Sequence, residues 1–77
     1  MLYCVKHPYE PLYKVGFTAD VARRMAEYKS HGMCVSPLLV VPGGRREEKS
    51  VHALLEGARA YGEWFRCSRE AVTLAMT

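Results

Sequence analysis

The sequence predicts an α+β fold, a single small domain over residues 1–77 in which helices flank a three-stranded, mainly antiparallel sheet. The patterns along the chain follow the order strand, strand, helix, strand, helix, and a short extended piece and a last helix come after them. No linker is long enough to separate two domains. A chain of 77 residues also has room for only one modest core.

The first two strands are predicted to form a hairpin. Residues Met1–Lys6 are rich in residues that favour strands. The two prolines within His7–Pro11 prevent this strand from continuing. A second strand then runs over Leu12–Gly16. Because only a short turn separates the two segments, they are expected to pair.

A helix follows the hairpin. Asp20 is expected to cap its first turn, since a side-chain oxygen there accepts hydrogen bonds from exposed backbone N–H groups. Val21, Met25 and Tyr28 recur at helical spacing and should face the core. Gly32 is predicted to end the helix.

The second half of the chain contains a third strand and two further helices. The apolar run Leu38–Val41 predicts a strand that is buried or nearly so, with Pro37 at its start, where a missing N–H group does least harm. After the break at Pro42–Gly44, a helix is expected over Arg45–Gly57. Its core side should carry four apolar residues, Val51, Leu54, Leu55 and Ala58. An extended piece (Glu63–Arg66) and a helix (Arg69–Met76) capped by Ser68 complete the chain.

Composition excludes several classes of protein. The chain is 49% hydrophobic and 25% charged, as in ordinary soluble globular domains. No apolar run approaches the roughly 20 residues that span a bilayer, and the first residues lack the pattern of a signal peptide. We therefore expect a cytoplasmic protein without a membrane partner. Three cysteines exclude a complete disulfide framework.

Basic residues gather in the middle of the chain. The formal net charge is +3, from 11 basic and 8 acidic residues. The central cluster consists of Lys14, Arg23, Arg24, Lys29, Arg45, Arg46 and Lys49. This distribution favours a basic face that binds a polyanion such as DNA.

Several short motifs occur in a fixed order and resemble a known superfamily. They are Tyr3 in the first strand, the tract Tyr13-Lys14-Val15-Gly16, Arg24 eight residues after that glycine, Tyr28 four further on, and Glu48 near the start of the second helix. Their order and spacing resemble the GIY-YIG nuclease superfamily over nearly the whole chain. The segments Glu48–His52 and Gly62-Glu63-Trp64-Phe65 are similar to a small phage and bacterial branch that carries Y-K-I-G and G-E-W-F motifs.

The resemblance implies a metal-dependent endonuclease or nicking nuclease that hydrolyses phosphodiester bonds in DNA. Glu48 matches the position that holds the divalent metal, usually Mg²⁺ and alternatively Mn²⁺. Arg24 would grip the scissile phosphate, and Tyr3 would act as general base or position the water. A domain of 77 residues is not expected to carry an appended recognition domain, so specificity would come from a homodimer, from a larger protein complex or from DNA shape.

Some residues depart from the superfamily pattern. Lys14 stands where the second motif has its tyrosine; it would contact phosphate or act on Tyr3, or its presence would mean that catalysis is lost. His52 is a second proton carrier, a ligand-facing partner of Glu48, or an ordinary histidine on the helix surface. The remaining candidates, expected to bind substrate, are Tyr13, Arg23, Tyr28 and Lys49.

Other interpretations stay open. The domain could be a noncatalytic nucleic-acid-binding module of the same fold. It could also be a structural zinc protein, since Cys4-x-x-His7 and His31-x-x-Cys34 have usable spacing. The pair Trp64-Phe65 could stack on bases or close the core. Glu63 receives no definite role, and only helix register separates Glu48 from Glu47.

Overall fold

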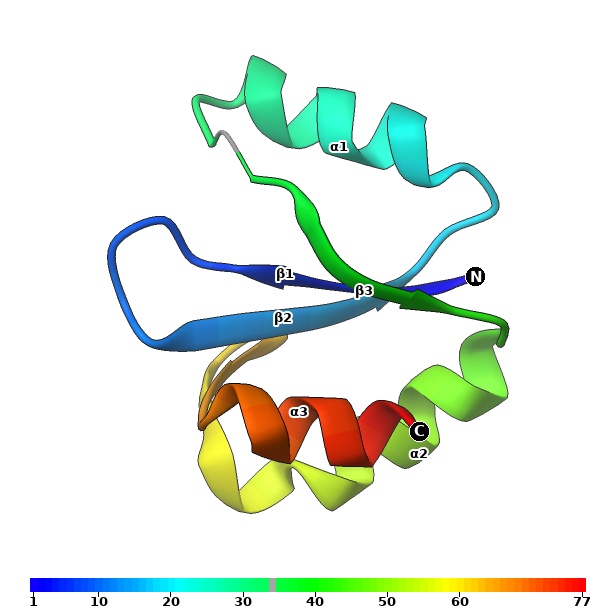
Figure 1. The fold of residues 1–77 in the computed structure, drawn as a ribbon, viewed down its shortest axis with the longest axis vertical. Helices are drawn as coiled ribbons and strands as arrows, with labels where there is room; N and C mark the ends of the chain where they lie inside the picture. Colours follow the sequence, from blue (N-terminus) through cyan, green and yellow to red (C-terminus); the bar gives the residue numbers. More distant parts are fainter. Residues whose placement is uncertain (34) are drawn as a thin grey trace.

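The structure, a computed structural model, describes residues 1–33 and 35–77 of the chain. In Figure 1, one helix lies on one side of the sheet and the other two lie on the opposite side, so the domain has three layers. The elements are β1 (Leu2–Lys6), β2 (Leu12–Phe17), α1 (Val21–Ser30), β3 (Pro37–Val41), α2 (Arg45–Leu54), a 3-10 turn η1 (Glu56–Ala58), β4 (Arg59–Tyr61), β5 (Trp64–Arg66) and α3 (Arg69–Met76).

The sheet is antiparallel throughout the described residues and has five strands in the order β3-β1-β2-β5-β4. The predicted α+β class and the β1–β2 hairpin are confirmed, but the expected number of three strands is wrong. The two additional strands, β4 and β5, have three residues each. All three side chains of β4 are exposed. This strand therefore has no alternation of buried and exposed residues by which it could be recognised.

The third strand begins at Pro37, as predicted, but it is not buried. β3 is an edge strand that pairs only with β1 among the described strands. Its side chains are half-buried or exposed, and Val40 is 38% exposed. The apolar run Leu38–Val41 indicated a buried strand, but a strand at the edge of a sheet is covered less completely than a central one.

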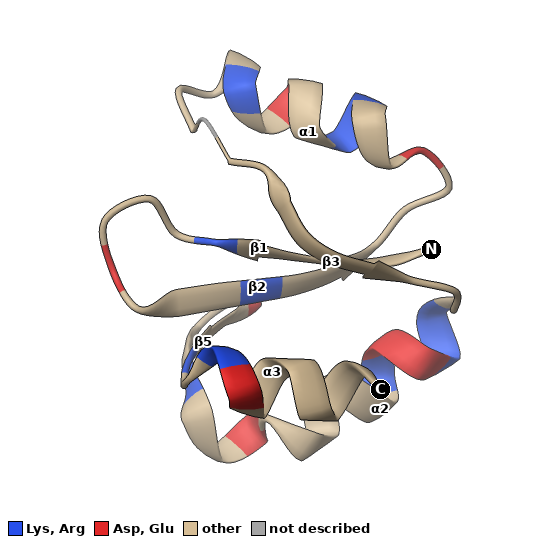
Figure 2. Ribbon diagram, in the orientation of Figure 1, with Lys and Arg blue, Asp and Glu red and all other residues tan. Residues whose placement is uncertain are grey.

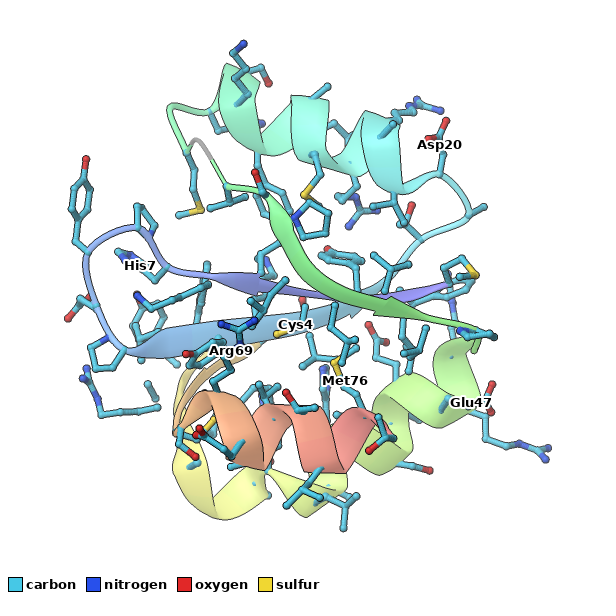
Figure 3. All side chains as sticks on the ribbon, in the orientation of Figure 1. Cys4, His7, Asp20, Glu47, Arg69 and Met76 are labelled. Carbon is cyan, nitrogen blue, oxygen red and sulfur yellow. The ribbon has the colours of Figure 1, made fainter. Side chains whose placement is uncertain are left out.

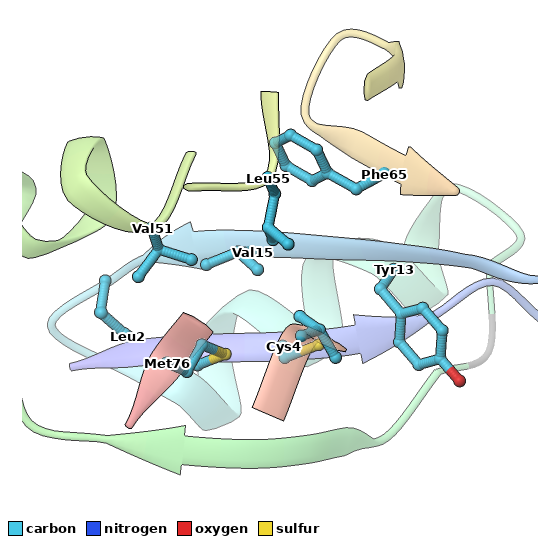
Figure 4. Packing of buried hydrophobic residues seen from close by; sticks show 9 residues of the cluster. Leu2, Cys4, Tyr13, Val15, Val51, Leu55, Phe65 and Met76 are labelled. Carbon is cyan, nitrogen blue, oxygen red and sulfur yellow. The ribbon is translucent and has the colours of Figure 1, made fainter. Parts of the chain in front are cut away.

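Alternate residues of the hairpin face opposite layers. Tyr3 lies opposite Gly16, and Cys4 lies opposite Val15. Toward α2 and α3, a core cluster comprises Leu2, Cys4, Tyr13, Val15, Val51, Leu55, Phe65, Val72 and Met76 (Figure 4). Toward α1, a smaller cluster comprises Tyr3, Val5, Leu12 and Trp64. Trp64 and Phe65 are thus both core residues, as one of the two interpretations predicted.

Local signals define α1. The Asp20 side chain accepts a hydrogen bond from the Arg23 N–H at 3.0 Å and caps the helix as predicted (Figure 3). Gly32 follows the end of the helix with φ +80°, which a glycine adopts without strain. The Met33 N–H then reaches back to the Tyr28 carbonyl at 2.9 Å. This C-terminal turn fixes Tyr28 against the sheet.

The second helix is shorter than predicted, and one of the four residues expected on its core side is exposed. α2 ends at Leu54 rather than at Gly57, and η1 follows it. Leu54 was expected on the core side, but it is 72% exposed. Val51 and Leu55 are buried, and at about 100° per residue Leu54 points about 80° away from the middle of the face that they share.

The last helix is confirmed. The Ser68 hydroxyl accepts from the Ala71 N–H at 3.1 Å, and α3 buries Val72 and Met76, which lie on one stripe. Among the described residues, none of the helices has the length and apolar character that a membrane crossing requires.

Candidate functional site

A cleft lies beside the part of β2 that does not pair with β5. β5 pairs with only Leu12–Lys14 of β2, so the end of β2 toward Phe17 has no partner from that side among the described strands. α2 packs against β2, and its residue His52 contacts the Val15 carbonyl near this end. The cleft has a volume of about 350 Å³ and draws its walls from β1, β2, α1, α2 and the β4–β5 turn. Its lining residues are Tyr3, Gly16, Phe17, Arg24, Arg45, Glu48, Lys49 and Glu63.

Tyr3 forms the floor of this cleft. Its side chain is fully buried and lies directly over Gly16 of the neighbouring strand. A Cβ atom added at Gly16 would be 2.5 Å from the Tyr3 hydroxyl oxygen, so the ring occupies space that only a glycine leaves. The glycine of the second motif thus determines where the tyrosine of the first motif lies.

Two residues of α1 hold the Tyr3 hydroxyl. Arg24 Nη1 donates to Tyr3 Oη at 3.4 Å, and the hydroxyls of Tyr28 and Tyr3 are hydrogen-bonded at 2.8 Å. Burial, together with the bond to Tyr3, raises the pKa of the Tyr28 phenol above its usual range. Tyr28 therefore keeps its proton and can donate it to Tyr3.

The Arg24 guanidinium is fixed but still accessible. Besides its bond to Tyr3, it pairs through Nε with Glu27 Oε1 at 3.1 Å, and the side chain is 40% exposed. A guanidinium carries five N–H donors. These two contacts leave donors that can reach a ligand in the cleft, in the planar arrangement that suits phosphate.

The structure separates the two adjacent glutamates of α2. Glu47 accepts a hydrogen bond from the Gly44 N–H through Oε1 at 2.7 Å, and so caps the first turn of the helix (Figure 3). Glu48, which is half-buried, lines the cleft instead. The carboxylate that faces Tyr3 and Arg24 is therefore that of Glu48.

His52 lies one helical turn after Glu48. Its Nε2 atom is 2.8 Å from the backbone carbonyl oxygen of Val15. Since a carbonyl oxygen can only accept, Nε2 carries the hydrogen, and in the neutral ring Nδ1 keeps a lone pair. The ligand atoms of Glu48, His52 and Glu63 all lie within 4.8 Å of one another, so this group could hold a metal ion.

Lys14 lies beside the cleft rather than among its lining residues. Its ammonium is 3.8 Å from Glu63 Oε1, and it lies over the rings of Tyr28, 5.3 Å from the centroid, and Trp64, 5.8 Å from the centroid. Lys14 thus links the turn that carries Glu63 to the helix that carries Tyr28.

The other predicted residues fall into three places. Lys49 lines the cleft together with Arg45, and Arg23 lies in an adjoining depression that shares Arg24. Figure 2 shows basic segments on α1 and at the start of α2, and within each helix an acidic segment interrupts them. Tyr13 is 6% exposed and packs in the core on the opposite face of the sheet, away from the cleft.

Sequence reasoning missed Arg45 and Glu63 as residues of the cleft. Glu63 directly follows Gly62, whose φ of +55° turns the chain from β4 into β5. Its position in the motif Gly62-Glu63-Trp64-Phe65 was a usable signal. Without the β4–β5 pairing, however, nothing indicated that this turn faces Glu48.

Among the described residues, two of the predicted zinc ligands, Cys4 and His7, lack the features of a zinc site. Cys34 lies outside the described residues. Burial, with a smaller contribution from Cys67, raises the pKa of the Cys4 thiol to about 12, whereas zinc requires a thiolate. His7 Nδ1 accepts from the backbone N–H groups of Tyr9 and Glu10, at 3.2 and 3.3 Å.

Comparison with known proteins identifies the family. A model of the T5orf172 domain matches residues 1–76. None of the curated proteins and none of the solved structures matches the chain. Because the match extends over almost the whole sequence, the chain belongs to the T5orf172 domain family, which is phage-associated and nuclease-related.

Proposed function

We propose that the protein is a metal-dependent endonuclease of the GIY-YIG type that nicks DNA by hydrolysing a phosphodiester bond. The observation that carries this proposal is the cleft itself. One space about 350 Å³ in volume is lined by a tyrosine, two arginines, a lysine and two glutamates, contributed by different elements of the fold. These are the groups that phosphoryl transfer needs, and the order of the motifs that supply them resembles that superfamily.

The donor set fits a divalent cation. Glu48 and Glu63 offer hard oxygen ligands in a cleft wide enough for several waters. Glu48 and its neighbours would hold Mg²⁺ or Mn²⁺. When bound, such an ion polarises a phosphoryl oxygen and makes a water molecule more acidic.

Arg24 supplies charge stabilisation. Its bonds to Tyr3 and Glu27 fix the guanidinium before substrate arrives, so little reorganisation is required during reaction. Its remaining donors would bind the oxygens of the scissile phosphate, on which negative charge accumulates. Arg45 and Lys49 at the edge of the cleft would bind the neighbouring phosphates of the same strand.

Tyr3 would hold the attacking water. In hydrolysis the water oxygen bonds to phosphorus, the bond between phosphorus and the leaving sugar oxygen breaks, and a proton passes from the water to the leaving oxygen through solvent or a side chain. The Tyr3 oxygen is held by Arg24 and Tyr28, and this fixed position suits the orientation of that water.

Supercoiled plasmid, branched DNA and single-stranded DNA test the proposal, each incubated with Mg²⁺, with Mn²⁺ and with chelator. Glu48→Gln is compared with Glu47→Gln, which removes the same charge one residue away but keeps an oxygen for the helix cap. We expect a loss of at least about 100-fold in nicking for Glu48→Gln, as for other groups that stabilise the transition state, and little change for Glu47→Gln.

The products and the binding curves distinguish the alternatives. One site per chain should give nicked circles before linear DNA at low protein concentration, and a homodimer or larger complex would be needed for double-strand breaks. Equal nicking by wild type and Glu48→Gln would contradict the proposal. If none of the DNAs is cut but salt-sensitive binding persists, the domain is a noncatalytic nucleic-acid-binding module. Lys14, which stands in place of the motif tyrosine, would then be the suspected cause of the lost cleavage.

A further inference from the structure

We propose that three protein side chains, Glu48, His52 and Glu63, ligate the metal in the cleft, and that the site therefore binds a first-row transition-metal ion such as Mn²⁺ more tightly than Mg²⁺. The role of the ion in catalysis rests on the proposed function. The existence of the metal site does not, because metal binding can be measured without DNA.

The distances among the three groups are close to those of ligands around one ion. Two ligands of the same ion can lie at most about 4.4 Å apart, twice a metal–ligand bond of about 2.2 Å. The ligand atoms of Glu48, His52 and Glu63 already lie within 4.8 Å of one another. A contraction of about 0.4 Å, less than the change of one side-chain rotamer, would bring them to this limit.

The fold holds two of the ligands on one rigid element. Glu48 and His52 are separated by one turn of α2, so their side chains project from the same side of the helix. Glu63 comes from the β4–β5 turn, and its side chain is 47% exposed. Two fixed ligands and one adaptable ligand form an arrangement that can close around an ion.

An independent observation concerns the ring of His52. Histidines that bind metals nearly always donate their other ring N–H to a carbonyl or carboxylate, which fixes the tautomer and the ring orientation. His52 makes this contact through Nε2 with the Val15 carbonyl at 2.8 Å. The same contact leaves Nδ1 as the ring nitrogen whose lone pair can bind an ion.

The imidazole determines which ions are favoured. Mg²⁺ binds through one or two carboxylates, keeps several waters and gains little from nitrogen. Mn²⁺, Fe²⁺, Co²⁺ and Zn²⁺ accept imidazole and carboxylate together. A site composed of Glu48, Glu63 and His52 therefore discriminates against Mg²⁺.

Lys14 opposes the ligation by Glu63 only weakly. Its ammonium lies 3.8 Å from Glu63 Oε1, too far for a hydrogen bond of ordinary strength. Lys14 is also 23% exposed, so water screens the pair. An ion of charge +2 would displace this contact readily.

Titration calorimetry of the purified protein without DNA tests the inference, with Mn²⁺ and Mg²⁺ as probes. The variants are His52→Gln, whose amide can still donate to Val15, and Glu63→Gln, with Glu47→Gln as the matched control. We expect one Mn²⁺ per chain, bound at least about tenfold more tightly than Mg²⁺, a difference of about 1.4 kcal/mol. Both variants should lose about tenfold in Mn²⁺ affinity, and only Glu63→Gln should also weaken Mg²⁺.

Pulsed electron paramagnetic resonance of the Mn²⁺ complex gives a second readout. A nitrogen modulation from coordinated imidazole should be present in wild type and absent in His52→Gln. Equal affinities for the two ions, with Mn²⁺ binding unchanged in His52→Gln and Glu63→Gln, would overturn the inference and leave the proposed nuclease intact, with Glu48 as sole ligand. Nitrogen-ligated Mn²⁺ in a protein that cuts none of the DNAs would support the inference and overturn the nuclease.

Discussion

Gly16→Ala should disable the site through a single methyl group. The added Cβ would lie 2.5 Å from the hydroxyl oxygen of Tyr3 and 2.6 Å from its Cζ, whereas carbon atoms in contact are about 3.5–4.0 Å apart. The Tyr3 ring must therefore move by about 1 Å. Because the ring is fully buried, its neighbours must move as well, at a cost of about 1–3 kcal/mol in the free energy of unfolding.

The same displacement breaks the contacts of the Tyr3 hydroxyl. Its bond from Arg24 is already 3.4 Å long, so a shift of about 1 Å away from Gly16 removes it or leaves it badly aligned. A misplacement of that size can cost about 100-fold in rate, and we expect this loss in plasmid nicking. Urea unfolding and the nicking assay should be run on the same preparations.

Gly57→Ala is the matched control. A Cβ added at Gly57 has no described atom within 4 Å, so the substitution should change the free energy of unfolding by at most about 0.5 kcal/mol and leave nicking unchanged. The reasoning is refuted if Gly16→Ala unfolds like wild type and nicks within threefold of it. It is also refuted if the two alanine variants lose activity equally.

Three further predictions concern stability and charge. Asp20→Ala should lower the free energy of unfolding by about 1 kcal/mol in urea titrations, because the Arg23 N–H loses its hydrogen-bond acceptor. Asp20→Asn should retain most of this stabilisation, since its side-chain oxygen can still accept. The folded state keeps the Cys4 proton up to about pH 12, whereas the unfolded chain releases it near pH 8.5. The free energy of unfolding should therefore fall between these pH values by about 1.4 kcal/mol per pH unit. Cys4→Ala should remove the part of this pH dependence that Cys4 causes. Lys14→Met should change the free energy of unfolding by less than about 1 kcal/mol, since its pair with Glu63 is partly exposed, but filter binding should show weaker attachment to DNA.

The parts of the fold that could be predicted are those that local chemistry specifies. The cap at Asp20, the glycine at position 32 and the cap at Ser68 each satisfy backbone groups within a few residues, so the signal and its effect lie together in the sequence. The limits of α1 and α3 followed directly from these residues. The apolar stripe of α1 then indicated which side of that helix meets the sheet.

The parts that were missed depend on pairing between distant segments. β4 has no buried side chain and is a strand because it pairs with β5. β3 is half-buried because it lies at the edge of the sheet, with no strand beyond it in the described part of the chain. Glu63 lines the cleft for the same reason, since its place is set by where β5 stops along β2. Tyr13 was expected to bind substrate, but it is buried in the core on the opposite face of the sheet, because successive residues of a strand point to opposite faces.

The small surface that α1 buries against the sheet affects how the site responds to DNA. All ten residues of α1 belong to the described part of the chain, and none of them is buried. Segments with so little buried surface open locally at a lower free energy than the whole domain, and hydrogen exchange of their amides is correspondingly fast. Each opening withdraws Arg24 and Tyr28 while the sheet stays folded. The affinity for substrate is then reduced by the fraction of molecules in which the helix is undocked, and a bound phosphate slows the exchange of the α1 amides.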